Sequence, residues 1–133
     1  MTAAGREMAL PLDRCTVECV DPDRVAAVIA QLPDDQTADD LAAIFGVLAE
    51  RGRVRLVAAL LEAGELCVCD LAAATGLSQT ACSHNLRLLR AHRLVRRRKQ
   101  GRNVYYALDD VHIRLLIDVA LQHLGHRDAV QVI

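Results

Sequence analysis

Apolar residues recur every three or four positions along most of this chain, which predicts a mainly helical protein. The spacing predicts helices over residues 23–31, 37–48, 54–63 and 111–124. Thr37 is expected to cap the second of these helices, and either Asp109 or Asp110 the last. Gly52 is expected to break the chain between the second and third helices, and Gly64 to end the third.

The stretch 64–108 carries a different pattern, with two short helices followed by two strands. Helices are predicted over 66–75 and 78–92, with Gly76 in the left-handed conformation between them and Ser78 as a cap. Strands are predicted over 94–99 and 102–108, joined by a turn at Gln100 and Gly101. The expected fold is mainly α with a small β-hairpin, a winged helix-turn-helix.

Composition and charge narrow this expectation. Because only 2% of the residues are aromatic while 53% are hydrophobic, the core must be aliphatic. The net charge of −1 hides a strong asymmetry, since no acidic residue lies between Leu71 and Leu108. Half of the 16 basic residues fall in that span: Arg87, Arg90, Arg93, Arg96, Arg97, Arg98, Lys99 and Arg102. Such a local excess of positive charge on a helix-turn-helix predicts DNA binding, although a solvated basic face is the alternative.

The predicted DNA contacts divide into two groups. Small polar side chains near the start of the helix predicted over 78–92, together with Arg87, are expected to reach base edges in a major groove. Asn85 and Arg90 are expected to contact either bases or phosphates. The basic residues of the wing are expected to contact phosphates, which supplies affinity without sequence choice. The residues are Ser78, Gln79, Thr80, Ser83, His84, Asn85 and Arg87 on the helix, and Arg96, Arg97, Arg98, Lys99 and Arg102 on the wing.

The last helix has metal ligands at both of its ends. Asp110 and His112 lie at the start, and His123 and His126 at the end. Eleven residues of helix separate His112 from His123 by roughly 16 Å, too far for one ion. If two such helices cross antiparallel in a homodimer, each half meets its counterpart, which predicts two zinc or cobalt sites across the interface. The alternative is that these histidines meet by chance at a helix end.

Cysteines provide a second candidate metal site. Cys67 and Cys69 sit at a predicted helix start, where an irregular backbone allows both thiols to point the same way. Cys15 and Cys19 could complete a four-thiolate site from the same chain or from the other protomer, and such a site favours cadmium, lead or zinc. Buried packing of Cys67 and Cys69 is one alternative, and redox sensing is another. Cys82 is expected to be a small core residue.

Several classes of protein are not expected. No apolar run reaches the length of a membrane span and no signal sequence is recognisable, so a cytoplasmic protein that does not bind membranes is predicted. The sequence shows no nucleophile–base arrangement, phosphate loop or open-site zinc motif, so an enzyme is not expected, nor an organic cofactor. The predicted organisation is an N-terminal arm (1–20), one DNA-binding and dimerisation domain (21–126), and a tail (127–133). The long apolar stripe of the last helix suggests that terminal helices form a homodimer.

From about Cys15 to His126 the chain resembles the ArsR/SmtB family of metal-sensing winged-helix repressors. The resemblance is carried by ELCVCDL, SHNLRLLR, KQGRNVYYAL and the Asp-x-His and His-x-x-His motifs of the last helix. It implies a homodimer that binds operator DNA, an imperfect inverted repeat, without metal and releases it when metal binds.

The resemblance also implies roles for particular residues. Cys15, Cys19, Cys67 and Cys69 match a cadmium- and lead-responsive thiolate site formed between protomers. Asp110, His112, His123 and His126 match a zinc site of the C-terminal helices, and a metal efflux or resistance gene is the implied target. A redox- or arsenite-responsive repressor that uses the cysteines is the alternative.

Overall fold

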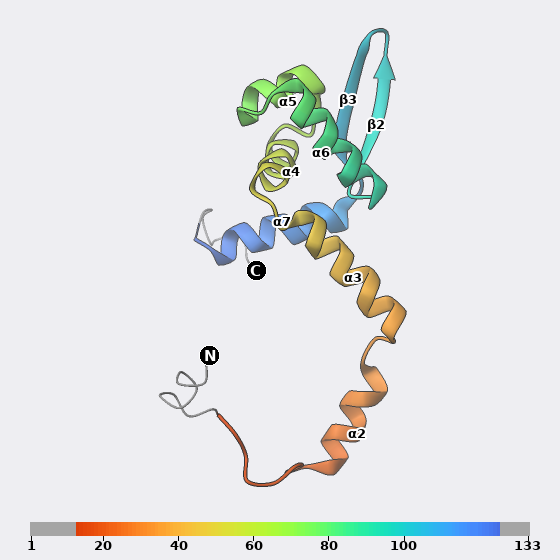
Figure 1. Cartoon of the computed structure of the whole chain (residues 1–133), viewed down its shortest axis with the longest axis vertical. Coiled ribbons are helices and arrows are strands. Elements are labelled where there is room, and N and C mark those ends of the chain that lie inside the picture. Colours follow the sequence, from red (N-terminus) through yellow and green to blue (C-terminus); the bar gives the residue numbers. More distant parts are fainter. Residues whose placement is uncertain (1–12, 126–133) are drawn as a thin grey trace, which may run out of the picture. The chain divides into compact units, whose positions relative to one another are not determined.

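The computed structural model describes residues 13–125, which form parts of two units, Met1–Asp34 and Asp35–Ile133 (Figure 1). The described part of the first unit contains one helix, α2 (Pro22–Gln31). Asp21 caps this helix by accepting a hydrogen bond from the backbone N–H of Arg24 at 3.1 Å, and Pro22 occupies the first helical position. The helix ends before Pro33, as predicted, and Val25, Val28 and Ile29 are exposed on it, as is Leu32 at its C-cap.

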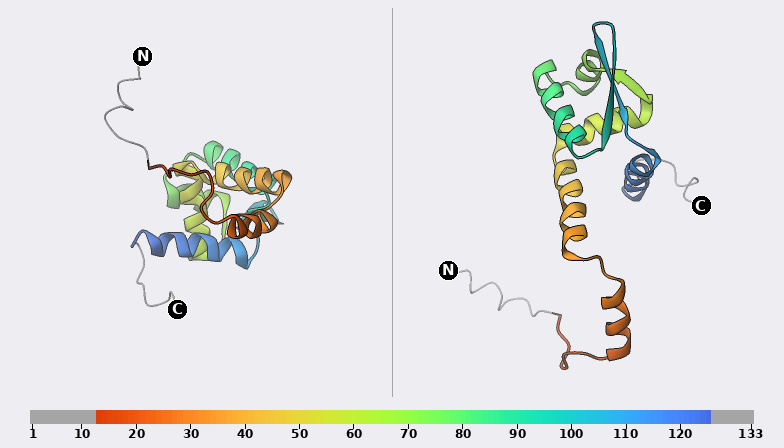
Figure 2. Two further views of the ribbon diagram at one scale, coloured as in Figure 1. Left: turned by 90° about the horizontal axis from the view of Figure 1, so that it is seen from below. Right: turned by 90° about the vertical axis from the view of Figure 1, so that its right-hand side faces the viewer.

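The second unit holds the helix-turn-helix and the wing (Figures 1 and 2). Its elements are α3 (Asp35–Leu48), α4 (Arg51–Ala63), β1 (Glu65–Cys67), α5 (Val68–Thr75), α6 (Gln79–Ala91), β2 (Val95–Gln100), β3 (Asn103–Leu108) and α7 (Val111–His123). This is the winged helix-turn-helix architecture that the sequence predicts.

The core of the second unit is aliphatic, as the composition requires. Helix α4 lies at its centre and contacts α3, α5, α6, α7 and two strands. Leu56, Val57 and Leu60 of this helix are completely buried. They pack with Leu71, Leu86, Leu89 and Leu94 in one cluster, and Tyr106 is the buried aromatic residue of that cluster.

A three-stranded antiparallel sheet replaces the simple hairpin that was predicted. The strand order is β1-β3-β2, and β1 pairs with β3 through Leu66 opposite Tyr106 and Cys67 opposite Tyr105. The predicted helix start at Leu66 is therefore wrong, because Leu66 and Cys67 belong to a strand whose partner is remote in the sequence. Helix α5 begins at Val68, with Cys67 as its N-cap residue.

Two expected helix boundaries also need correction. Thr37 is not a cap, since α3 already begins at Asp35. Gly52 is not a helix breaker, since it lies in the first turn of α4 and is buried. The interruption between α3 and α4 falls instead at Ala49 and Glu50. The Glu50 carboxylate caps α4 by accepting a hydrogen bond from the backbone N–H of Arg53 at 3.0 Å.

No helix within residues 13–125 is long and apolar enough to cross a lipid bilayer.

Candidate nucleic-acid interface and metal centres

The turn between α5 and α6 has the geometry that the sequence predicts. Gly76 ends α5 with φ of 79°, and its N–H donates to the carbonyl oxygen of Ala72. Ser78 then caps α6, because its Oγ accepts a hydrogen bond from the backbone N–H of Ala81 at 3.0 Å. The inner face of α6 is anchored by Cys82, Leu86 and Leu89, all completely buried. The Ser78 hydroxyl, a predicted DNA contact, is thus already used as a cap.

The outer face of α6 presents polar groups around a shallow groove. Gln79, Thr80, His84 and Arg87 are exposed, while Ser83 is half-buried between them. The groove is lined by these five residues. Donors and acceptors on an exposed helix whose first turn holds no acidic residue suit the edges of base pairs in a major groove.

Asn85 has a different environment from the other predicted DNA contacts on α6. It is half-buried, and its Oδ1 accepts a hydrogen bond from Nη1 of Arg53 at 3.2 Å. Arg53 also donates from Nε to the carbonyl oxygen of Val47, the end of α3. Asn85 therefore joins α6 to the α3–α4 junction, an association that spacing alone does not reveal.

The basic residues of the wing divide between the two faces of the sheet. Residues paired across antiparallel strands point to the same face. Arg97 and Lys99 lie opposite Tyr106 and Val104, on the face that continues from the core. Arg102 is exposed beside the turn at Gly101. No hydrogen bond or ion pair with any residue of 13–125 is made by the side chains of Arg97, Lys99 and Arg102.

Arg96 and Arg98 lie on the opposite face and are engaged within the protein. Nη1 of Arg96 donates to the carbonyl oxygens of Leu108 and Asp109, at 2.9 and 2.7 Å. Arg98 forms an ion pair with Glu65, which lowers the pKa of that carboxyl because the guanidinium hydrogen-bonds it. Of the predicted phosphate contacts on the wing, Arg96 and Arg98 therefore have partners within residues 13–125.

The Cys67 and Cys69 thiols converge, as expected for an irregular helix start. Their Sγ atoms lie 3.1 Å apart, with a carboxylate oxygen of Asp70 in the same cluster, in which all ligand atoms lie within 4.8 Å. Sulfur atoms around a tetrahedral zinc ion, with bonds of about 2.3 Å, are about 3.8 Å apart. The two Sγ atoms would therefore need to move apart only slightly to bind an ion. Contact with Cys69 raises the pKa of the Cys67 thiol. The donor set fits a soft divalent cation.

The other cysteines occupy different places. Cys15 and Cys19 are exposed and lie in the first unit, ahead of α2. Cys82 is buried, which raises the pKa of its thiol, and it sits in the core as predicted. Asp70 was not among the predicted ligands, although it directly follows the cysteine pair in ELCVCDL.

Asp110 and His112 come together at the start of α7. Asp110 is the N-cap, and its Oδ1 accepts hydrogen bonds from the backbone N–H groups of His112 (2.9 Å) and Ile113 (3.2 Å). These bonds, first that from Ile113, lower the pKa of the Asp110 carboxyl. Its Oδ2 lies 3.5 Å from Nδ1 of His112. An anionic carboxylate beside an exposed imidazole fits one half of a zinc site.

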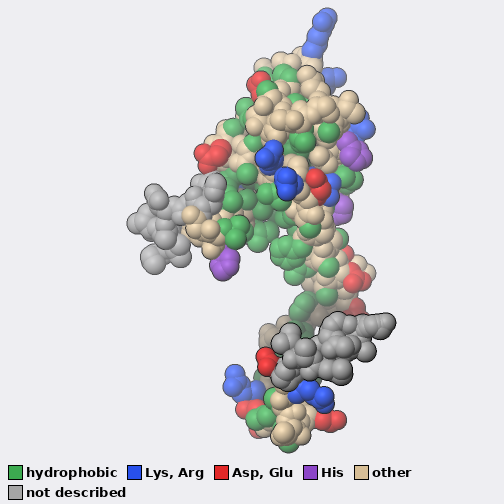
Figure 3. All heavy atoms as spheres, turned by 60° about the vertical axis from the view of Figure 1, so that its left-hand side comes forward, with side chains coloured by type: hydrophobic (Ala, Val, Ile, Leu, Met, Phe, Trp, Pro, Cys, Tyr) green, Lys and Arg blue, Asp and Glu red, His purple; other side chains and the backbone are tan. Residues whose placement is uncertain are grey.

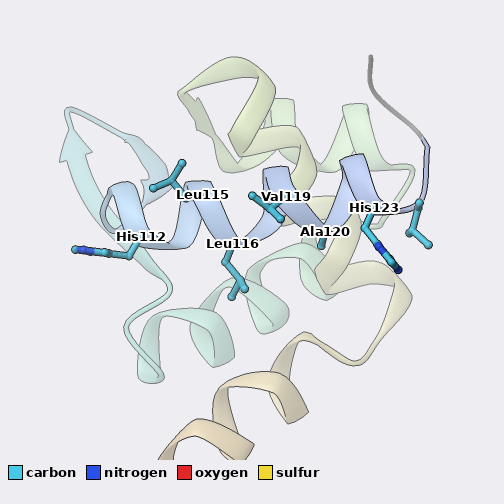
Figure 4. A pocket seen from close by; sticks show the side chains of 7 residues that line it. His112, Leu115, Leu116, Val119, Ala120 and His123 are labelled. Carbon is cyan, nitrogen blue, oxygen red and sulfur yellow. The ribbon is translucent and has the colours of Figure 1, made fainter. Parts of the chain in front are cut away.

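His123 lies at the far end of the same face of α7, and His126 lies outside the described residues. Figure 4 shows His112 and His123 at the two ends of this face, with Leu115, Leu116, Val119 and Ala120 between them. An apolar groove thus runs along α7 from one histidine to the other.

Helix α7 has two apolar faces. Ile113 and Ile117 pack against the core, whereas Leu115, Leu116 and Val119 are 55%, 37% and 59% exposed. Figure 3 shows hydrophobic side chains gathered on the surface of the second unit. Residues 13–125 leave the second face of α7 uncovered, and exposed apolar patches of this kind mark protein interfaces.

A helix-turn-helix with an exposed polar outer face, and with wing cations that have no partner within residues 13–125, defines a sequence-specific DNA-binding protein. Comparison with known proteins identifies the family to which this DNA-binding protein belongs. Residues 50–97 match the family described as bacterial regulatory protein, arsR family. A transcriptional repressor SmtB homolog from Synechocystis is 43% identical over 86% of both chains. A cadmium resistance transcriptional regulatory protein CadC homolog from Staphylococcus aureus is 38% identical over 84% of this chain and 91% of the relative.

A solved structure agrees with these relatives. The homodimeric winged helix-turn-helix DNA-binding domain of Mb0332 from Mycobacterium bovis matches with a TM-score of 0.61 and 32% identity, over 74% of this chain and 95% of that one. The chain therefore belongs to the arsR family, in its ArsR/SmtB branch of metal-sensing transcriptional repressors. As a member, it binds operator DNA and forms homodimers.

Proposed function

We propose that the dimer represses a metal efflux or resistance gene and leaves its operator when a cadmium, lead or zinc ion binds. The observation that carries this proposal is the convergence of the Cys67 and Cys69 thiols at the start of α5, the first helix of the helix-turn-helix. A ligand bound there touches the DNA-reading unit directly, without occupying its outer face.

The operator is an imperfect inverted repeat. Each protomer places its α6 in a major groove, so the two half-sites lie about one helical turn, roughly 34–36 Å, apart. Gln79, Thr80 and His84 read bases, while Arg97, Lys99 and Arg102 contact phosphates, because these side chains are exposed and the three cations are unengaged within 13–125.

The thiolate site consists of Cys67 and Cys69 with Cys15 and Cys19. Four thiolates suit soft ions, and the N-terminus of α5 stabilises thiolates through its backbone N–H groups. The ion supplies a fixed divalent charge that holds these thiolates together. Cadmium is favoured among the candidates because the Staphylococcus aureus relative is named for cadmium resistance. Coupling free energies of the usual size, about 1–3 kcal/mol, weaken operator binding by about 5- to 150-fold.

A second site lies on α7. Asp110 and His112 hold one side of a zinc or cobalt ion, and His123 and His126 of the opposing protomer hold the other. The proximity of Asp110 to His112, and the position of His123 at the far end of the same face, support this assignment.

The test is fluorescence anisotropy of a labelled operator, titrated with the dimer before and after cadmium. Wild type should lose about 5- to 150-fold of its affinity, whereas Cys67→Ser should bind the operator normally and ignore cadmium. Cys67→Ser should also lose the ultraviolet thiolate-to-cadmium charge-transfer band. Cys82→Ala is the matched control, since it removes a buried core thiol and should keep both responses.

Three outcomes are informative. A full cadmium response in Cys67→Ser would remove this thiol from the mechanism. Release by zinc alone, with the cysteines dispensable, would assign regulation to the α7 site. Release by arsenite or a thiol oxidant, with cadmium, lead and zinc inactive, would instead establish the arsenite- or redox-responsive alternative.

A further inference from the structure

Arg98 is the most thoroughly engaged cation of the wing. Its Nη2 and Nε donate to the two carboxylate oxygens of Glu65, at 2.8 and 3.1 Å. Its Nη1 donates to Oε1 of Gln100 at 2.6 Å. The guanidinium carbon lies 4.7 Å from the centroid of the Tyr105 ring, a cation–π contact. A guanidinium has five N–H donors, so three are already directed into the protein.

The partners of Arg98 form a row across the sheet. Cys67 of β1 lies opposite Tyr105 of β3, and Tyr105 lies opposite Arg98 of β2. Paired residues share a face, so a thiol, an aromatic ring and a guanidinium stand in line on one side of the sheet. Glu65, two positions before Cys67 on the same strand, closes the row by binding Arg98. One end of this row is a proposed metal ligand, and the other is the wing.

We infer that Arg98 is a positioning residue of the wing, not a phosphate contact, and that the Glu65–Arg98–Tyr105 cluster transmits metal binding at Cys67 to the wing. The second half of this inference rests on the proposed function. Arg97 and Lys99, on the other face of the same strand, remain the phosphate contacts.

The physical reason lies in the geometry of β1. This strand has three residues, so the two side chains that share this face of the sheet, exposed Glu65 and buried Cys67, move as one short unit. When an ion binds, the Sγ atoms of Cys67 and Cys69 must move apart from 3.1 Å to the spacing of a tetrahedral site, and this movement shifts β1. The bidentate Glu65–Arg98 pair has strict planar geometry, so it follows the shift and carries β2 with it.

The first experiment counts phosphate contacts without metal. The slope of the logarithm of operator affinity against the logarithm of salt concentration changes by about 0.9 for each phosphate contact. Arg97→Gln, the matched control on the opposite face, should therefore reduce the slope of the dimer by about 1.8, one contact per protomer. Arg98→Gln should leave the slope unchanged. A reduction equal to that of Arg97→Gln would overturn the inference.

The second experiment measures the cadmium response of the same variants. Residues that carry coupling change it by about 0.5–2 kcal/mol, which corresponds to about 2- to 30-fold in the ratio of operator affinities with and without cadmium. Arg98→Gln and Glu65→Gln should both lower this ratio by such a factor, while Arg97→Gln preserves it. Unchanged ratios in both cluster variants would overturn the inference.

A spectroscopic readout is independent of DNA. The chain has two tyrosines and no tryptophan, so in Tyr106→Phe the tyrosine fluorescence comes from Tyr105 alone. Cadmium added to this dimer should change that fluorescence with the same stoichiometry as the charge-transfer band. In Tyr106→Phe combined with Arg98→Gln the change should be smaller. Equal changes in both proteins would contradict a path through Arg98.

Failure of the proposed function can be distinguished from failure of the transmission path. If cadmium does not release wild type from the operator, the proposed function fails, yet the salt slopes still decide the role of Arg98. If cadmium releases wild type and all cluster variants equally, the proposed function stands and the transmission path fails.

Discussion

Arg53 of α4 donates a hydrogen bond to the side-chain oxygen of Asn85 in α6, at 3.2 Å, while its Nε binds the last turn of α3 through the Val47 carbonyl. The Arg53 side chain is only 17% exposed. One guanidinium thus connects α3, on which Leu41 and Phe45 are exposed, to α6, the helix proposed to read DNA. The position of α6 is set by this bond as well as by core packing.

The first prediction is that Asn85→Ala weakens folding more than sequence recognition. A hydrogen bond to a charged, largely buried group contributes about 1.5–3 kcal/mol, so the free energy of unfolding should fall by about 1.5 kcal/mol. Urea denaturation at fixed dimer concentration measures this change. The preference among operator variants should not change.

His84→Ala provides the opposite control on the same helix. His84 is exposed on the outer face, so its removal should alter stability by no more than about 0.5 kcal/mol. Operator discrimination should fall by about 1–3 kcal/mol at one base pair. If Asn85→Ala instead relaxed discrimination at one base pair, Asn85 would be a base-reading residue after all.

The second prediction concerns acid stability. Hydrogen bonds from the backbone N–H groups of Gly52 and then Arg53 hold the pKa of the Glu50 carboxyl below its ordinary value of 4.5. A lowered folded-state pKa stabilises the protein above pH 4.5, and that contribution is lost as the pH falls through the folded-state value. Glu50→Gln should therefore be less stable than wild type at neutral pH and lose less stability on acidification to about pH 3.

The measurement is urea denaturation of both proteins across that pH range. Glu18→Gln, in the first unit, is the control, because it removes a carboxyl that caps no helix in the described structure. Parallel pH profiles for wild type and Glu50→Gln would show that Glu50 does not hold the start of α4.

The third prediction tests the turn of the helix-turn-helix. Gly76 has φ of 79°, a conformation that costs an alanine about 1–2 kcal/mol. A Cβ at this position would meet nothing within 4 Å, so backbone strain alone should account for the loss in Gly76→Ala. Gly76→Asn should lose less, because asparagine tolerates the left-handed region. Equal losses in the two variants, measured by urea denaturation, would point to a cause other than backbone strain.

The elements best predicted from the sequence are those with local signals. Gly76, the Ser78 cap and the turn at Gly101 mark the helix-turn-helix and wing through residues only a few positions apart. Strand β1 has no such signal, because it pairs with Tyr105, Tyr106 and Ala107 of β3, which are distant along the chain. Taken without its partner strand, the three-residue segment Glu65–Cys67 has the sequence pattern of a helix start.

The candidate sites show the same division. The convergence of Cys67 and Cys69 follows from their spacing at a helix start, and so does the contact of Asp110 with His112. Alternation along β2 predicts that Arg97 and Arg98 face opposite ways, but not which of them meets an acidic partner. Glu65 supplies that partner from another strand, so only the three-dimensional structure separates a free cation from an engaged one.

The fourth prediction concerns the uncovered face of α7. Val119 is 59% exposed in the groove between His112 and His123, so Val119→Glu should place a charge in the dimer interface twice, once per protomer. An unpaired buried charge weakens association by several kcal/mol, so the dimer dissociation constant should rise at least about a hundredfold. Sedimentation equilibrium measures this constant.

Val111→Glu is the matched control for that variant. Val111 is similarly exposed at 57% but does not line the groove, and an acidic residue is favourable in the first turn of a helix. Its dimer should remain as strong as that of wild type. If Val119→Glu also dimerised normally, this face of α7 would not be the interface.

The last prediction separates the two proposed metal sites. His123 lies at one end of the α7 groove and Asp110 with His112 at the other, so a dimer of antiparallel α7 helices brings unlike ends together. His123→Ala should abolish operator release by zinc, because it removes one imidazole ligand from each of the two symmetric sites. Operator affinity without metal and release by cadmium should both persist, since the thiols are untouched.

His92→Ala is the control. This exposed imidazole hydrogen-bonds the Leu88 carbonyl at the end of α6, away from the α7 groove, and its removal should leave the zinc response intact. Fluorescence anisotropy measures the zinc and the cadmium response of each of the two variants. A normal zinc response in His123→Ala would exclude His123 as a ligand.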